Sequence, residues 1–177
     1  GNSICKAPPA RRSTNGRAAL PAWIARRFPP GMQRRMVDVG GVRMHVAIWD
    51  GPGPTVVLLH GNPTWSFLWR KVIAALQGDG LRVVAPDLIG LGLSDKPRDV
   101  AAHQLSAHAA WFGHLLDELA PGPLCFAGQD WGGPIGLVAL AERRDRLRGL
   151  VLANTVIGPP LRANTVPVTT SVSTGWL

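Results

Sequence analysis

The chain has 177 residues, of which 46% are hydrophobic, and its formal net charge is +8 at pH 7. This hydrophobic content excludes disorder throughout, and the length corresponds to roughly one domain of about 150 residues. Residues 1–35 contain eight of the 19 Lys and Arg and no acid, whereas residues 36–177 contain eleven residues of each sign. A nucleic-acid-binding domain would carry its positive charge on the folded part, so the neutral folded part argues against nucleic acid as a partner.

The basic segment 1–35 is predicted to be a disordered leader. Its first 22 residues contain no apolar core of about 7–15 residues, so they do not form a secretory signal; a transit peptide or translated upstream sequence remains an alternative. No stretch approaches the roughly 18 apolar residues of a membrane span. The two cysteines, Cys5 and Cys125, make no disulfide framework. We therefore expect a cytoplasmic protein with no membrane partner.

From residue 36 onward, the hydrophobic pattern predicts alternating strands and helices. Residues 42–49 alternate as in an antiparallel edge strand, and the apolar residues of 65–76 fall on one helical stripe. Short apolar runs predict buried strands at residues 55–59, 81–85, 124–127 and 149–153, and helices are expected at residues 65–76, 103–119 and 132–144. This order predicts an α/β fold with a mostly parallel sheet and helices on both of its faces.

Two loops follow predicted strands, at the strand ends where such sheets bind ligands. They span residues 60–65 (HGNPTW) and residues 128–133 (GQDWGG). The second has the spacing of a nucleophile elbow, a strand-to-helix turn so tight that its flanking positions must be glycine. Asp130 occupies the nucleophile position. Because an alkylated carboxylate is an ester that water can hydrolyse, Asp130 suits displacement at a saturated carbon rather than acyl transfer.

Three motifs, HGNPTWSFLWR, APDLIGLGLSDKP and GQDWGGPIGL, resemble the haloalkane dehalogenases of the α/β-hydrolase superfamily, from about residue 36 to residue 155. The resemblance implies hydrolysis of small uncharged haloalkanes by water to halide and alcohol, without cofactor or metal. It makes Asp130 the nucleophile that forms an alkyl-enzyme ester. The side chains of Asn62 and Trp131 would bind the halide, and their backbone N–H groups would form the oxyanion hole. It also suggests a cis bond between Asn62 and Pro63.

Each proposed role has a structural alternative. Asp130 could cap a helix, Trp131 could only pack, and Asn62 could form the turn before Pro63. His60 is expected to be structural, because the base of an α/β hydrolase comes last in the chain.

Five other residues near the motifs need no catalytic role. Trp65 and Trp69 are predicted to belong to the core because they lie on the helical stripe. Asp87, Ser94 and Asp95 are explained by turn chemistry in a tight loop.

The catalytic triad of this fold runs in the order nucleophile, acid, His. The general base and its partner acid are absent from this chain, because all five histidines precede Asp130 and the later acids, Glu142 and Asp145, are predicted surface charges. Asn154 stands where one branch of the family has a catalytic Glu, so the chain resembles the branch whose acid follows the next strand. The histidines are His45, His60, His103, His108 and His114.

The chain is accordingly predicted to be an incomplete hydrolase fold. Residues 36–157 would form the N-terminal part of the core, and residues 158–177, which show no helical stripe, an irregular tail. That tail could begin a different segment, mark a truncation or be an out-of-frame ending. Without the cap, the C-terminal strands and the base, the chain is expected to be alkylated once at most and not to turn over.

Two alternative functions remain. An epoxide hydrolase shares the Asp nucleophile and the DWGG elbow, but it tends to have an aromatic residue where this chain has Asn62. The other alternative is a non-catalytic fragment or pseudoenzyme, which could self-associate through its exposed sheet.

Overall fold

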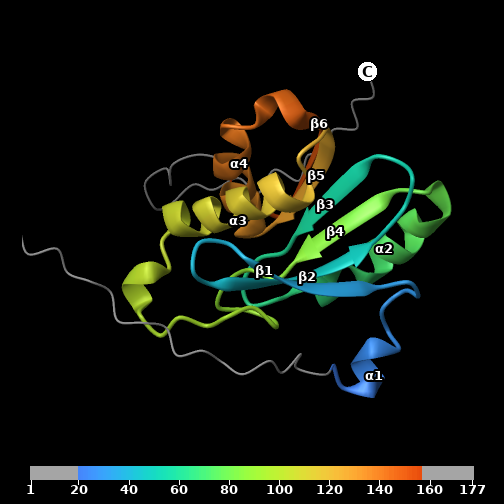
Figure 1. The fold of residues 1–177 in the computed structure, drawn as a ribbon, viewed down its shortest axis with the longest axis horizontal. Coiled ribbons are helices and arrows are strands. Elements are labelled where there is room, and N and C mark those ends of the chain that lie inside the picture. The colour runs from blue at the N-terminus through green and yellow to red at the C-terminus, as the bar shows by residue number, and fades with distance from the viewer. Residues whose placement is uncertain (1–19, 157–177) are drawn as a thin grey trace, which may run out of the picture.

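The computed structural model describes residues 20–156, which form a six-stranded sheet covered by helices (Figure 1). The strand order is β1-β2-β4-β3-β5-β6. The strands are β1 Gln33–Asp38, β2 Arg43–Trp49, β3 Thr55–Leu59, β4 Arg82–Pro86, β5 Leu124–Gln129 and β6 Leu147–Ala153, and the helices are α1 Ala22–Ala25, α2 Arg70–Leu76, α3 Leu105–Leu119 and α4 Gly132–Ala141. Strands β4, β3, β5 and β6 run parallel, whereas β2 pairs antiparallel with β1 and with β4. The predicted α/β fold with a mostly parallel sheet is confirmed.

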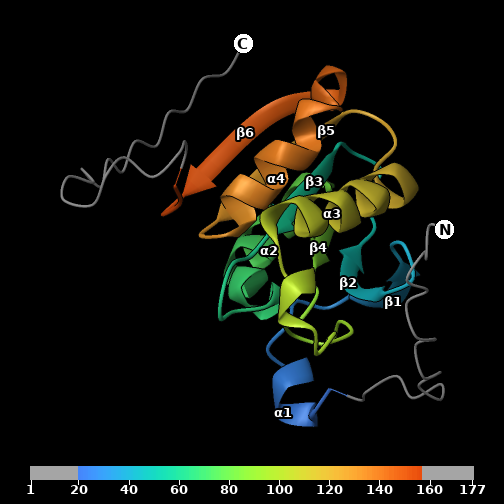
Figure 2. The ribbon, with the colours of Figure 1, turned by 90° about the vertical axis from the view of Figure 1, so that its left-hand side faces the viewer.

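Both faces of the sheet carry a hydrophobic core. On one face, α3 and α4 pack beside each other across the sheet, against Val57 and Leu59 of β3 and Val84 of β4 (Figure 2). On the other face, α2 packs against Leu58 and Val83. Successive residues of these strands therefore point into different cores, which explains their continuous apolar sequences.

The prediction that residues 1–35 are a disordered leader is wrong for residues 20–35. These residues form α1 and β1, and Phe28 between them is only 7% exposed. Its ring lies 5.9 Å from that of Trp49 and 5.2 Å from that of Phe67, measured between centroids. This aromatic contact holds the segment on the α2 face, and residues 1–19 lie outside the described part of the chain.

The prediction of an edge strand at residues 42–49 also needs correction. Strand β2 is antiparallel as expected, but β1 pairs with it along its full length, from Gln33 opposite Ile48 to Asp38 opposite Arg43. β2 is therefore an internal strand, and β1 forms the edge.

The predicted helix at residues 65–76 is divided into a 3-10 turn, Ser66–Trp69, and α2. Trp69 is buried in the core, as predicted, and Trp65 packs partly buried against the same core. Leu68 and Val72 remain exposed, so the buried stripe is narrower than the sequence indicates. The chain leaves this region at Gly80, whose φ of 67° is left-handed.

The other predicted elements lie close to their observed positions. The helices expected at residues 103–119 and 132–144 are α3 and α4, the second ending three residues earlier. Within residues 20–156, no helix has the length and apolar character needed to cross a bilayer. The tail predicted at residues 158–177 lies outside the described residues.

Candidate active site

Asp130 lies in the sharp turn between β5 and α4 and has a left-handed backbone conformation, with φ of 52°. A non-glycine residue adopts this conformation at a cost, and the surrounding structure must hold it. Gly132 begins α4 where a Cβ atom would collide with the carbonyl oxygens of Leu59 and His60. The glycine thus lets the turn approach the end of β3, as a nucleophile elbow requires.

Residues 60–65, the Asn62 loop, lie against this elbow because β3 and β5 are neighbouring parallel strands. The backbone N–H of Asn62 donates to Oδ1 of Asp130 at 2.8 Å. A Cβ atom at Gly61 would collide with the Asp130 carboxylate, so only glycine allows this approach. The Asn62-Pro63 bond is cis, as expected.

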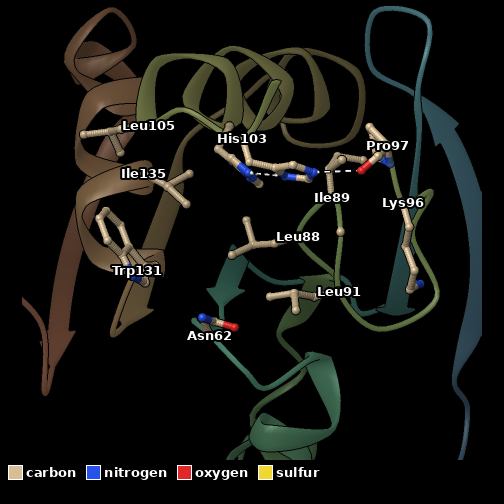
Figure 3. Close-up of a pocket in the computed structure, with 12 residues that line it drawn as sticks. Asn62, Leu88, Ile89, Leu91, Lys96, Pro97, His103, Leu105, Trp131 and Ile135 are labelled. Atoms are coloured by element: carbon tan, nitrogen blue, oxygen red, sulfur yellow. Dashed lines mark hydrogen bonds between the residues drawn. The ribbon is translucent and has the colours of Figure 1, made fainter. Parts of the chain in front are cut away.

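A cavity of about 390 Å³ opens beside these residues (Figure 3). The side chains of Asn62 and Trp131 lie at one end of it, and Trp131 keeps 52% of its surface exposed instead of packing into the core. Most of the remaining wall is aliphatic, from Leu88, Ile89, Leu91, Leu105 and Ile135. Two neutral N–H donors therefore lie beside a largely aliphatic wall, and Lys96, His103 and His108 line the rest of the cavity.

His103 lies at the end of the cavity away from Asn62 (Figure 3), and with His108, which also lines the cavity, it forms a pair that the sequence did not indicate. His103 Nδ1 lies 3.3 Å from His108 Nε2, and His103 Nε2 lies 3.0 Å from the carbonyl oxygen of Pro97. Burial, together with the nearby His103, lowers the pKa of His108. Both residues follow the motif APDLIGLGLSDKP, but a five-residue spacing at the start of a helix carries no recognisable signal.

His60 is completely buried behind the Asn62 loop. Its Nδ1 bonds the carbonyl oxygen of Gly61 at 2.8 Å, and its Nε2 accepts the Leu88 N–H at 2.9 Å. Burial lowers the pKa of His60, so the ring is neutral at pH 7. These contacts agree with a structural role in which His60 joins the Asn62 loop to the cavity wall.

Turn chemistry alone does not explain Asp87, which makes long-range contacts. Its buried carboxylate accepts the Ser66 N–H at 2.8 Å, the Leu93 N–H at 2.9 Å and a bond from His45 Nδ1 at 2.9 Å. Burial alone would raise the pKa of Asp87, but these hydrogen bonds hold it below the ordinary value. The Asp87 carboxylate thus links His45 of β2 and the backbone of Ser66 to the loop that contains Leu93.

Ser94 and Asp95 likewise bond to β2 and not only within their turn. The Ser94 hydroxyl donates to the Asp87 carbonyl oxygen at 2.6 Å and accepts the His45 N–H at 2.8 Å. The Asp95 carboxylate accepts hydrogen bonds from the backbone and the guanidinium of Arg43. The loop that forms one wall of the cavity is therefore fixed to the sheet.

Within residues 20–156, no histidine forms a hydrogen bond with the Asp130 carboxylate. Glu142 and Asp145 are exposed, as predicted, and Glu142 lies 3.7 Å from its neighbour Arg143. Asn154 and Thr155 lie next to Asp130. The Asp130 N–H donates to the Asn154 carbonyl oxygen at 3.2 Å. Of these two neighbours, the sequence indicated only Asn154.

Comparison with known proteins agrees with this geometry. The family model of the alpha/beta hydrolase fold matches residues 54–171. The chain is 45% identical to haloalkane dehalogenase 2 of Mycobacterium bovis over 127 residues, which is 72% of this chain and 43% of that protein.

Two solved structures are similar to this chain in fold. A haloalkane dehalogenase from Paraglaciecola agarilytica has a TM-score of 0.68 and 36% identity, covering 75% of this chain and 46% of that one. An epoxide hydrolase from Vigna radiata has a TM-score of 0.64 and 34% identity, covering 69% of this chain and 38% of that one. The chain spans less than half the length of these relatives. The sheet, the elbow and the family match show that the chain belongs to the alpha/beta hydrolase fold family.

Proposed function

We propose that this chain carries the nucleophile and the halide-binding donors of a haloalkane dehalogenase. The observation that carries the proposal is the Asp130 carboxylate, held at 2.8 Å by the Asn62 N–H, beside a cavity that Asn62, Trp131 and mostly aliphatic side chains line. The similar haloalkane dehalogenases supply the substrate class.

The first chemical step is a displacement at the carbon that bears the halogen. Oδ2 of Asp130, which has no hydrogen bond to any residue within 20–156, attacks that carbon. A C–O bond forms, the C–halogen bond breaks, and the halogen leaves with the bonding pair as halide. The side-chain N–H groups of Asn62 and Trp131 stabilise the departing anion without binding it as tightly as a full positive charge would.

The second step is hydrolysis of the ester by water. Water adds to the ester carbon of Asp130, and negative charge develops on Oδ1, which already accepts the Asn62 N–H. The bond between that carbon and Oδ2 then breaks, and Oδ2 leaves with the alkyl group as the alcohol, which takes up the proton that water loses. This addition needs a general base, and no histidine follows Asp130 in the 177 residues. We therefore expect the ester to accumulate on this chain.

Intact mass spectrometry of the 177-residue chain treated with 1-bromohexane tests the proposal. We expect one hexyl group per chain, located at residue 130 by fragmentation, and none on Asp130→Asn, which lacks the nucleophile. Asp145→Asn, which removes an exposed acid, is the matched control and should be alkylated like the parent. A folded sample without an adduct would refute the nucleophile, and many halides released per chain would refute the accumulation of the ester.

Epoxide opening is the second candidate, because an epoxide hydrolase is among the similar structures. The two are separated by Trp131→Phe, which keeps an aromatic ring and removes the N–H. A hydrogen bond to a charged group contributes about 1.5–3 kcal/mol, so alkylation by 1-bromohexane should slow by about ten-fold or more. Alkylation by 1,2-epoxyhexane has no halide to stabilise and should change little. A faster parent reaction with the epoxide, unaffected by the substitution, would favour epoxide hydrolysis.

A further inference from the structure

The two residues that follow β6 hold the backbone of Asp130 from both sides. The Asp130 N–H donates to the carbonyl oxygen of Asn154 at 3.2 Å, and the Thr155 hydroxyl donates to the carbonyl oxygen of Asp130 at 2.6 Å. These bonds fix the two peptide groups that flank the Asp130 Cα atom. Because the orientations of those groups define φ and ψ, the loop after β6 constrains both dihedral angles of the nucleophile.

The Thr155 side chain also fills the space beside the first turn of α4. A Cβ atom at Gly133 would collide with the hydroxyl and the Cβ of Thr155. The Gly133 N–H donates to the same Asp130 carbonyl oxygen, at 3.1 Å. One donor thus comes from the elbow itself and the other from Thr155, so the glycine at 133 and the threonine at 155 form a complementary pair.

This support matters because Asp130 is in a strained conformation. Its φ of 52° is left-handed, and that of Asn154, which supplies the other bond, is 48°. Strained residues keep their geometry only while their neighbours enforce it. The carboxylate must at the same time stay 2.8 Å from the Asn62 N–H, and a small rotation of the Asp130 backbone would break that contact.

We propose that Thr155 is a positioning residue for the nucleophile: its hydroxyl locks the Asp130 peptide so that the carboxylate points at the substrate carbon. The proposal rests on the proposed function. Thr155 does not line the cavity, so its effect passes through Asp130 and not through contact with substrate.

Thr155→Val and Thr155→Ser form a matched pair for the test. Valine keeps the shape and removes the hydrogen bond, whereas serine keeps the hydroxyl and removes a methyl group. We expect the maximal rate of alkylation by 1-bromohexane to fall about ten-fold in Thr155→Val and to stay within about two-fold of the parent in Thr155→Ser. The half-saturating concentration of 1-bromohexane should not change in either variant.

Hydrogen exchange of the same variants gives a readout that needs no reaction. The amides of residues 130–133 should exchange about ten-fold faster in Thr155→Val and at the parent rate in Thr155→Ser, while the amides of α3 stay unchanged in both. Faster exchange in α3 as well would show a general loss of stability and would overturn the proposal.

The outcomes separate the two proposals. If the parent is alkylated, equal alkylation rates in Thr155→Val and the parent overturn the positioning role, whatever the exchange shows. If the parent is not alkylated, the proposed function fails, and the exchange of residues 130–133 still decides whether Thr155 holds Asp130: unchanged exchange overturns it, and faster exchange supports it.

Discussion

At the scale of single residues, buried polar groups shape the site more than the charges on the surface do. Asp87 illustrates this, because its carboxylate accepts bonds from three separate segments, at His45, Ser66 and Leu93. Its neighbour Leu88 lines the cavity and bonds to His60, which in turn holds the Asn62 loop. A carboxylate that does not itself line the cavity therefore helps to fix the loop that does.

Asp87→Asn should reduce the free energy of unfolding by about 2–3 kcal/mol at pH 7. The NH2 group of the asparagine would face one of the N–H groups that now donate to the carboxylate. Two donors cannot bond to each other, so both would lose their hydrogen-bond partner. Urea unfolding measures the loss, with the exposed Asp79→Asn as a control that should be neutral.

The same carboxylate predicts a pH dependence. Because the pKa of Asp87 is lower in the folded state, its contribution is complete above the ordinary value of 3.8 and is lost as the pH falls below it. The difference between the parent and Asp87→Asn should narrow below that pH, and a constant difference down to pH 2 would contradict this account.

At the scale of elements, sequence periodicity predicts what is decided locally and misses what is decided by a distant partner. The apolar runs of β3, β4 and β5 predict their positions to within one or two residues, because most residues of β3 and β4 and one full face of β5 are buried. The first three residues of β1, Gln33 to Arg35, fall within the predicted basic leader, and in the whole strand only Val37 is buried. β1 is a strand because each of its residues pairs with a residue of β2.

Phe28→Ala tests whether the segment before β1 contributes to stability. Truncating a buried aromatic residue costs about 3–5 kcal/mol, so thermal or urea unfolding should show a loss near the lower end, since Phe28 lies at the edge of its core. Trp23→Ala in α1 removes a larger ring that is 56% exposed and should cost little. Equal effects of the two substitutions would show that the aromatic contact of Phe28 does not anchor the segment.

The candidate site shows the same division between local and distant information. The glycine spacing of residues 128–133 predicts the elbow, because a tight turn requires glycine at positions that are close together in the sequence. The contacts of Thr155 with Asp130 and of His103 with His108 could not be predicted. They join residues whose types are common in loops and helices, and only the folded chain brings them together.

At the scale of the whole molecule, the two edges of the sheet differ in character. β1 carries Arg34 and Arg35, and charged side chains discourage pairing with another sheet. At the opposite edge, β6 exposes Leu150 and Val151, the latter to 57%, and within residues 20–156 no further strand pairs with it (Figure 2). An open apolar edge is a template for strand addition.

We expect this chain to self-associate through β6, with a second copy as the partner. Sedimentation of the 177-residue chain should show a mass that rises with concentration, and Val151→Lys should weaken the association at least several-fold. Met36→Lys, an equivalent change on β1, should leave it unaltered. Association that is equally sensitive to both changes, or to neither, would place the contact elsewhere.

The adjacency of β3 and β5 also has a consequence for how the site comes into being. Asn62 and Asp130 are 68 positions apart in the chain, and β4 and α3 lie between them, so their hydrogen bond requires a long loop to close first. Neither the loop that contains Asn62 nor the loop that contains Asp130 can form this hydrogen bond without the other. Reactivity of Asp130 toward an alkyl halide should therefore arise late in refolding, and the time at which chains become alkylatable marks the moment when the centre of the sheet closes.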